Sequence, residues 1–551
     1  MKFSLPQLHE AIAAAVPDRE ALVFRDKRFT FAQLTDRTRC LANFFLSRGI
    51  TIHQQRKNLD NWESGQDHVA LLMLNGNEYL ESTLGALKAQ AVPFNVNFRY
   101  VEKELLYVLN NANAKAIVYH SQFAPRLSAI LKDLPHLATL IQVKDGSGIE
   151  LLPGALDYDD LIANSSSSKP NVVWSPDDLY MLYTGGTTGM PKGVLWRQGD
   201  LITSALGGKN ADGSVIDCID TFTERATGGR RHRFLTTPPF MHGASHWLAF
   251  NAWHGGNTVI VQNNVEKLDP PDVLSVIEKE RATALMLVGD AFGRPILEEI
   301  QRGNYDLSCI KIIMNNGAIL NHPVKVALLE MLPAAKIVDN MGASETGSQG
   351  VKISTLEGIT SKNSADATNF KLSADNVVLS EDLQKVLEKG HDGTGWLAKK
   401  VHVPLGYLDD REKTQSTFPE VDGQRYAVPG DKVQLKEDGN ILFFGRDSST
   451  INSGGEKIFA EEVERALKYH PSVFDAVVAG RPSERWGNEV VAVVQLRKSS
   501  PFDKNSILDE CGKHIARYKL PKAFSIVATI KRSPSGKADY RWAKLEAEKA
   551  S

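Results

Sequence analysis

Residues 178–193 read DLYMLYTGGTTGMPKG, an apolar run that leads directly into a loop rich in glycine and threonine. The run predicts a strand, and the glycines after it let backbone N–H groups approach an anion closely. Hydroxyl donors and one ammonium complete a loop suited to a polyphosphate. Its expected contacts are Thr184, Gly185, Gly186, Thr187, Thr188, Gly189 and Lys192. A Walker A loop ends in Gly-Lys-Ser/Thr, whereas Lys192 stands between Pro191 and Gly193, so a P-loop kinase or GTPase is disfavoured.

Strand-like and helix-like segments alternate around this loop. Apolar runs at 68–74, 139–143 and 258–262 predict strands, and the stretches 78–90 and 271–281 predict helices. Strands separated by helices are typical of α/β layers with largely parallel sheets. After residue 445 the pattern changes to short strand and helix pieces within about a hundred residues, the size of one small domain. We therefore predict a large, multi-subdomain α/β region over residues 1–447 and a small α+β domain over residues 448–551.

The composition bounds the class of protein. The 551 residues include 64 Lys+Arg and 66 Asp+Glu, so the formal net charge is −2. This balance excludes a broadly basic, counterion-releasing surface, and we expect no nucleic-acid partner. Four well-separated cysteines without CxxC spacing disfavour a disulfide scaffold or a zinc module. No run of about 18 apolar residues occurs. We therefore expect a cytoplasmic protein without a transmembrane segment, and the oligomeric state, a homo-oligomer included, stays open.

Five further motifs, together with this loop, establish a resemblance to a known family. The stretch 183–193 resembles the phosphate loop of the adenylate-forming (AMP-binding) enzymes, which include acyl-CoA synthetases, luciferases and nonribosomal adenylation domains. The other motifs follow in the order of that family: NNGA at 315–318, DNMGASETG at 339–347, YAVPGD at 426–431, GRDSSTINSGGEKI at 445–458 and SPSGK at 533–537. Met341 replaces the tyrosine that is usual in the second of these. The resemblance implies the fold of that family, with a mobile C-terminal lid.

The resemblance also implies roles for individual residues. Glu345 would bind a Mg²⁺ ion that bridges the ATP phosphates. Lys537 would neutralise the charge that develops as a carboxylate attacks the α-phosphate. Asp431 would accept hydrogen bonds from both ribose hydroxyls. The remaining nucleotide contacts would be Asn316, Gly317, Ala318, Asn340, Met341, Gly342, Ser344 and Arg446.

The reaction implied by this family has two steps. Attack of a carboxylate on the α-phosphate of ATP gives an acyl-adenylate and pyrophosphate, and a thiol then displaces AMP from the acyl carbonyl. Between the steps the C-terminal domain would rotate about Ser448, where many relatives carry Asp or Lys, and would withdraw Lys537. Gly454 and Gly455 would either lie near the pantetheine tunnel or form a plain β-turn.

The segment PPFMHGAS at 238–245 resembles the lining of the acyl pocket in that family. His242 stands where many acyl-CoA synthetases have a histidine, and we count it among the candidate catalytic residues. Relatives that activate amino acids place an aspartate near Gly243 to pair the α-amino group, so an amino-acid substrate is disfavoured. Apolar residues that could line the pocket are Trp247, Leu248, Phe250, Phe292 and Met341. The whole pattern is most similar to actinobacterial-type synthetases, which implies a medium- or long-chain fatty acid or a steroid side-chain acid as substrate.

Three functions stay open from the sequence. The first is an ATP-dependent acyl-CoA ligase that uses Mg²⁺ and CoA, favoured because no carrier domain follows in this chain. The second is an acyl-AMP ligase that loads a separate carrier protein. The third is a non-catalytic nucleotide-binding protein of the same fold, against which the intact Lys192, Glu345, Asp431 and Lys537 argue.

Overall fold

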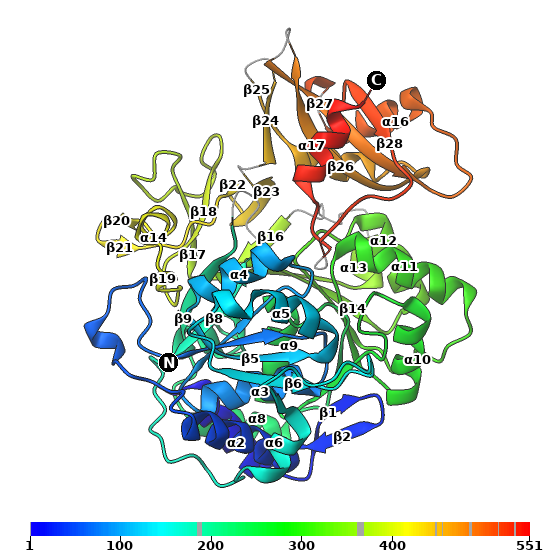
Figure 1. Cartoon of the computed structure of the whole chain (residues 1–551). Helices are drawn as coiled ribbons and strands as arrows, with labels where there is room; N and C mark the ends of the chain where they lie inside the picture. The colour runs from blue at the N-terminus through cyan, green and yellow to red at the C-terminus, as the bar shows by residue number, and fades with distance from the viewer. Residues whose placement is uncertain are drawn as a thin grey trace.

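The structure is a computed structural model, and it describes residues 2–184, 190–360, 369–446, 449–453, 456–483, 487–515, 517–533 and 536–550. Figure 1 shows a large lower body, coloured blue through yellow, with a smaller orange and red C-terminal domain above it. The lower body contains the two larger parallel sheet regions, and the upper domain has a sheet of its own. Ser448 and the loop glycines 185, 186 and 189 lie outside the described residues.

A five-stranded parallel sheet forms the first layer of the N-terminal region. Its order is β4 (Val92–Asn95), β3 (His68–Leu72), β5 (Ala114–His120), β6 (Thr139–Val143) and β7 (Leu156–Asp157). Alternate side chains of β3 face opposite sides, so Leu71 joins the core with α2 (Phe31–Ser47) and α3 (Asn77–Lys88). Leu72 instead joins the cluster of α4 (Glu102–Asn111) and α5 (Ala124–Ile130). The short helix α6 (Tyr158–Asn164) follows β7.

The second sheet is parallel through its first half. Neighbouring strands β1, β11, β10, β12, β13 and β14 are all parallel, and β2 pairs antiparallel at the edge. These strands are β1 (Glu20–Phe24), β2 (Lys27–Thr30), β10 (Arg233–Thr236), β11 (Thr258–Val261), β12 (Ala284–Leu287), β13 (Ile312–Asn316) and β14 (Lys336–Ala343). One face packs against α10 (Pro270–Glu280), α11 (Gly289–Arg302) and α12 (His322–Met331), through side chains such as Leu285, Ile313 and Ile337. The prediction of α/β layers is confirmed here.

The same sheet continues beyond β14 with antiparallel strands, which the sequence did not predict. The order is β15 (Gly347–Ser354), β16 (Asn369–Leu372), β23 (Asn440–Arg446), β22 (Asp431–Leu435), β18 (Gly395–Lys399) and β17 (Asn376–Leu379). Among the residues described between β15 and β16, the helical element is the short α13 (Leu356–Thr360). Antiparallel neighbours need no crossover helix. Strand and helix therefore stop alternating in this part of the chain.

A third, small sheet frames the glycine- and threonine-rich loop. Strands β8 (Leu179–Thr184) and β9 (Lys192–Arg197) form an antiparallel hairpin around it, and β19 (Gly406–Tyr407) pairs with β9. Directly after β19 come α14 (Arg411–Thr417), β20 (Glu420–Val421) and β21 (Gln424–Arg425). The hairpin therefore brings residues from two distant parts of the sequence to the base of one loop.

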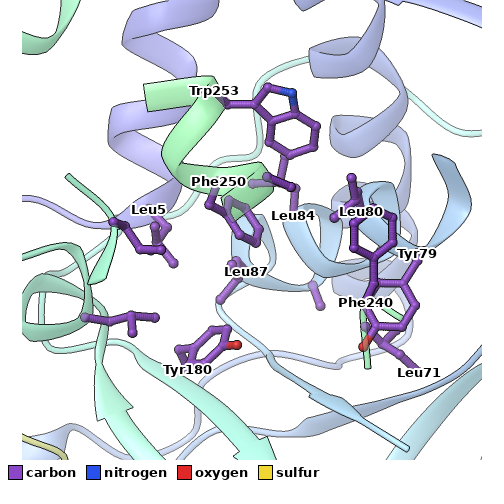
Figure 2. Packing of buried hydrophobic residues seen from close by; sticks show 14 of the residues in the cluster. Leu5, Leu71, Tyr79, Leu80, Leu84, Leu87, Tyr180, Phe240, Phe250 and Trp253 are labelled. Atoms are coloured by element: carbon purple, nitrogen blue, oxygen red, sulfur yellow. The ribbon is translucent and has the colours of Figure 1, made fainter. Parts of the chain in front are cut away.

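The main hydrophobic core lies between these layers. Figure 2 shows Leu80, Leu84 and Leu87 of α3 near Phe250 and Trp253 of α9 (Gly243–His254), with Tyr180 of β8 and Phe240 close by. These residues belong to one cluster of buried side chains, which also includes residues of α1 (Leu5–Ala15), α7 (Gln198–Ala205) and α8 (Ile219–Gly228). This packing fixes α9, and with it the candidate acyl segment, against the β8–β9 hairpin.

The C-terminal domain is a small α+β unit. Its sheet contains β25 (Glu456–Phe459), β24 (Thr450–Ser453), β27 (Gly487–Leu496) and β26 (Val473–Ser483), and β28 (Ala523–Ile526) also pairs with β27. Side chains of α15 (Ala460–Leu467) and α16 (Lys504–Cys511) cover one face, and those of α17 (Tyr540–Glu548) the other. Across the described ranges, no helix has both the length and the apolar character that crossing a bilayer requires.

Candidate functional site

Lys192 lies at the base of the predicted polyphosphate loop. It begins β9, and its backbone is directly opposite Thr184 at the end of β8. The Lys192 ammonium forms an ion pair with Asp410, which also accepts a hydrogen bond from the backbone N–H of Lys413 at 2.9 Å. Burial favours the neutral acid, but the Lys192 partner and the Lys413 N–H outweigh it and hold the pKa of Asp410 below its usual value. Gly185, Gly186, Thr187, Thr188 and Gly189 fall outside the described residues.

Glu345 stands in the tight turn that joins β14 to β15. The hydroxyl of Tyr407 donates a hydrogen bond to Glu345 Oε1 at 3.0 Å, and the indole N–H of Trp196 donates to the Ser344 carbonyl at 2.9 Å. Tyr407 and Asp410 lie three residues apart, so one short segment bonds to both Glu345 and Lys192. These two partners were not predicted from the sequence, although a Gly-Tyr pair shortly before two aspartates (GYLDD, 406–410) was a visible signal.

The predicted adenine-side loop follows β13. Asn315 connects it to its surroundings, because its amide donates to Asp339 Oδ1 at 2.9 Å and to the Ala318 carbonyl at 3.1 Å. Its Oδ1 accepts from the Gly289 N–H at 2.7 Å. Asp339 is bonded on its other oxygen to the buried Lys325 ammonium at 2.6 Å. At Gly317 the backbone φ of +77° lies in the left-handed region that favours glycine.

The structure brings the two nucleotide motifs of β13 and β14 together. Asn316 and Asn340 are directly paired in the parallel ladder, so the segments 316–318 and 340–344 end at the same edge of the sheet. Met341 packs beside the buried cluster of the antiparallel strands, which includes Val433 and Ile441. We therefore assign Met341 to packing against these strands.

Asp431 and Arg446 also become neighbours. They are paired in the antiparallel ladder of β22 and β23, and Asp431 is buried. The Arg446 side chain, Gly454 and Gly455 lie outside what the structure describes. Among the described residues, no group of three or more His, Cys, Asp or Glu side chains is arranged to hold a metal. A lone carboxylate such as Glu345 suits Mg²⁺, which takes one or two protein carboxylates and completes its shell with phosphate oxygens and water.

Lys537 reaches the N-terminal region from the C-terminal domain. The adjacent Gly536 has a φ of +74°, and a Cβ at that position would lie 2.9 Å from Val288 Cγ1, just before α11. Figure 1 shows the red segment before α17 descending toward this body. Burial lowers the pKa of His242 to about 3, and the Lys537 charge contributes to that shift. The lysine and His242 therefore lie close enough to interact electrostatically.

His242 begins the turn into α9, and its Nε2 is buried without a hydrogen-bond partner among the described residues. Four residues on, His246 is fully bonded: its Nδ1 lies 2.7 Å from the Phe240 carbonyl, and its Nε2 contacts the Tyr180 hydroxyl. Burial lowers the pKa of His246 to about 4, so the ring is neutral at physiological pH. Trp247 Nε1 donates to the same hydroxyl at 2.9 Å. The sequence analysis had no signal for this Tyr180–His246–Trp247 chain.

The position of Gly243 bears on the substrate. A Cβ added there would lie 2.7 Å from Leu182 Cδ2 and 3.4 Å from the Trp247 ring, so an aspartate does not fit without movement. Leu248, Phe250 and Phe292 are buried in the core, and Trp247 is partly buried. The surroundings of residue 243 are therefore apolar and closely packed.

Comparisons with known proteins show the family and the fold. Residues 9–408 match the family described as "AMP-binding enzyme", and residues 462–537 match "AMP-binding enzyme C-terminal domain". The chain is 48% identical to "Medium-chain acyl-CoA ligase Mig" of Mycobacterium avium, over 99% of this chain and 98% of that one. It is 37% identical to "Medium/long-chain-fatty-acid–CoA/3-oxocholest-4-en-26-oate–CoA ligase" of Mycobacterium tuberculosis, over 99% and 96%. The crystal structure of the anthranilate CoA ligase AuaEII in complex with anthranoyl-AMP shares the fold, with a TM-score of 0.81 at 20% identity over 99% and 98% of the chains.

Proposed function

The chain belongs to the AMP-binding enzyme family, and we propose that it is an ATP-dependent acyl-CoA ligase for a medium- or long-chain fatty acid or a steroid side-chain acid. The relatives that match almost its whole length are named as ligases of such acids. The structural observation that carries the proposal is the close approach of Gly536, next to Lys537, to Val288, which also lies beside Gly317 of the first nucleotide motif. The Lys537 charge also acts on His242.

In the first step, a carboxylate oxygen of the acid attacks the α-phosphorus of ATP. The α–β phosphoanhydride bond breaks, pyrophosphate leaves, and the mixed anhydride acyl-AMP forms. We assign Lys537 to the charge that develops on the α-phosphate and Lys192 to the leaving pyrophosphate. Glu345 would hold Mg²⁺, which supplies charge neutralisation to the phosphates when it is bound.

In the second step, the thiol of CoA attacks the acyl carbonyl carbon, and the bond to the AMP oxygen breaks. The thiol proton leaves to solvent or to a nearby base, and AMP is released. His242 is neutral because burial lowers its pKa to about 3, so we assign it to positioning the acyl group by hydrogen bonding rather than to carrying charge. The close packing around Gly243 supports an apolar acid and disfavours an amino acid.

We also propose that the chain works as two units, residues 1–447 and 448–551, which rotate between the two steps. The large sheet ends with β23 at Arg446, and β24 of the separate C-terminal sheet begins at Thr450. A reaction that consumes ATP and CoA draws on pools inside the cell, which supports a cytoplasmic location.

The deciding experiment incubates the protein with ATP, Mg²⁺, CoA and a panel of acids: straight-chain acids of medium and long length, a steroid with a carboxylated side chain, and an amino acid as the negative control. We expect AMP, pyrophosphate and acyl-CoA from the apolar acids alone. ADP as the nucleotide product would exclude the proposal. Pyrophosphate exchange without CoA turnover, restored by a carrier protein, would favour the acyl-AMP ligase. ATP binding without pyrophosphate release for any acid would favour a non-catalytic role.

A further inference from the structure

A buried lysine lies beneath the turn that carries Glu345. Lys399 ends β18 and is 1% exposed. Its ammonium donates to the Thr346 carbonyl at 2.8 Å and to the Ser348 carbonyl at 3.1 Å. Thr346 lies in the turn between β14 and β15, and Ser348 is the second residue of β15, so the two acceptors flank Gly347, whose φ is +66°. The ammonium therefore binds the inner side of a left-handed turn, directly after Glu345.

The inner side of the turn, at Thr346 and Gly347, is closely packed. A Cβ at Gly347 would lie 2.9 Å from the Ser204 carbonyl oxygen, and a Cβ at Gly342 would lie 2.1 Å from the Gly347 carbonyl oxygen. Thr346 is fully buried, and its hydroxyl oxygen accepts from the Ala343 N–H at 3.0 Å. The turn therefore tolerates little displacement, and a change in the ammonium beneath it must move the backbone that carries Glu345.

Holding a charge at this position is costly. Burial lowers the pKa of Lys399 to about 7, the Lys209 charge adds to the shift, and Asp375 opposes it. Asp375 forms its own ion pair with Lys209. An apolar side chain would avoid this desolvation, but it would leave two buried carbonyls without their donor. The lysine is therefore suited to fixing the turn in one geometry.

The exposed side of the same turn carries the candidate metal ligand. Among the described residues, the side-chain hydrogen bond that Glu345 receives is a neutral one, from Tyr407 to its Oε1. Its carboxylate position therefore depends on the backbone of residues 344–348, which is held by Trp196 at Ser344 and by Lys399 at Thr346 and Ser348. We propose that Lys399 is a positioning residue for the nucleotide-binding step: its ammonium fixes the 344–348 turn so that Glu345 presents its carboxylate to the magnesium–ATP complex. The role of Lys399 in catalysis rests on the proposed function.

The first test is binding. The ATP affinity is measured by calorimetry, once with Mg²⁺ and once with EDTA. We expect Lys399→Met to reduce the gain in affinity that Mg²⁺ provides by about tenfold. The reason is that a displacement of about 1 Å in a positioned group has effects of about ten- to a hundredfold. The matched control is Lys88→Met. Lys88 is another fully buried lysine, and it pairs with Glu10 far from the site. After the substitution Glu10 keeps its ion pair with Arg39. The control loses stability without changing the magnesium dependence. An equal loss of ATP affinity with and without Mg²⁺ would overturn the proposal.

The second test is a double-mutant cycle with Glu345→Gln on the same magnesium-dependent affinity. If Lys399 acts through Glu345, the two substitutions are strongly non-additive, whereas additive effects contradict the mechanism. Should Lys399→Met fail to fold, Lys399→Arg is measured in its place. We expect a smaller loss in the same direction, because the planar guanidinium cannot occupy the ammonium's position between the two carbonyls. A magnesium dependence unchanged in Lys399→Arg would count against the proposal.

A third measurement separates this inference from the proposed function. We expect Lys399→Met to slow acid-dependent pyrophosphate exchange but not the reaction of CoA with preformed acyl-adenylate, which no longer needs the magnesium–ATP complex. Equal slowing of both half-reactions would indicate a general structural role for Lys399. If the unaltered protein exchanges no pyrophosphate with any acid, the proposed function fails, while the binding cycle still decides whether Lys399 positions Glu345.

Discussion

The ion pair between Arg497 and Glu298 joins the C-terminal domain to the large body, and it therefore offers a direct test of domain movement. Arg497 follows β27 and is anchored within the C-terminal domain, because its Nε donates to the Pro471 carbonyl at 2.9 Å. Its Nη1 lies 3.7 Å from Oε1 of Glu298, on α11 of the large body. Val288, which meets Gly536 of the lysine loop, directly precedes the same helix. Both contacts therefore hold the C-terminal domain against one helix.

The size of the effect follows from exposure and distance. The side chains are 40% and 35% exposed, and ion pairs of this kind contribute about 0.2–1 kcal/mol. Coulomb's law in bulk water gives about 1 kcal/mol at this separation, and salt screening reduces the attraction between exposed charges further. Loss of the pair would therefore change the occupancy of this domain orientation by roughly 1.4- to 5-fold, since about 1.4 kcal/mol corresponds to tenfold.

The assay compares two half-reactions in Glu298→Gln, Arg497→Gln and the double variant. If the domain orientation seen here is the adenylate-forming one, each single variant slows pyrophosphate exchange by about 1.4- to fivefold. Thioester formation from preformed acyl-adenylate is unchanged or faster, since the other orientation is then more populated. The double variant is no slower than either single one, and the whole effect fades at high salt.

Arg302→Gln is the matched control for this pair. Arg302 lies 3.7 Å from the same Glu298, but it belongs to α11 itself and does not join the two domains. The control should leave the ratio of the two half-reactions unchanged. Additive single effects, or equal slowing of both half-reactions, would refute the assignment of Arg497 and Glu298 to the adenylate-forming orientation.

Three further predictions concern single side chains. Lys537→Ala should impair adenylate formation by about 10²–10³-fold and thioester formation far less; equal losses in both half-reactions would contradict the alternating-domain proposal. Asp410→Asn keeps a side-chain oxygen that accepts from the Lys413 N–H but releases Lys192 from its ion pair, so the KM for ATP should fall several-fold. A raised KM would show instead that the ion pair positions Lys192. Burial lowers the pKa of His254 to about 4 in the folded protein. As the pH is lowered from about 6.5 to 4, the unfolded state binds a proton at this side chain and the folded state does not, so the free energy of unfolding decreases as the pH decreases. His254→Asn should make that slope shallower by up to about 1.4 kcal/mol per pH unit, measured by urea unfolding; an unchanged slope would show that other groups set it.

The sequence was sufficient for those features that are local. The alternation of apolar runs and amphipathic stretches predicted the parallel half of the large sheet, because each βα unit buries a strand and one helix face close together in the chain. The antiparallel half was not predicted, since β16 pairs with β15 on one side and with β23, some seventy residues further on, on the other. No local periodicity records which distant strand becomes a neighbour.

The same distinction applies to the site. Lys192, Glu345 and Lys537 stand in contiguous motifs and could be named from the residues around them. Their partners could not be, because Asp410 lies 218 positions from Lys192 and Tyr407 lies 62 positions from Glu345. Lys399 had a weak signal, a lysine within the apolar strand GWLAK, but its contact with the Glu345 turn depends on how β18 packs against β15. Motifs thus predicted the groups that we propose to face substrate, and only the fold showed which side chains bond to them.

The partners also explain how a chain with a net charge of −2 can hold a nucleotide polyphosphate. Lys192 is paired with Asp410, Lys325 with Asp339, and Glu345 is bonded to Tyr407. Binding of ATP at such a site is an exchange of partners, so only the difference between the old and new interactions contributes to affinity. An inorganic anion offers Lys192 one new partner, whereas magnesium–ATP bound as we propose would engage Lys192, Glu345 and the 316–318 loop at once. Pre-paired charges therefore favour the complete nucleotide over simple anions, and a locally compensated site needs no basic surface around it.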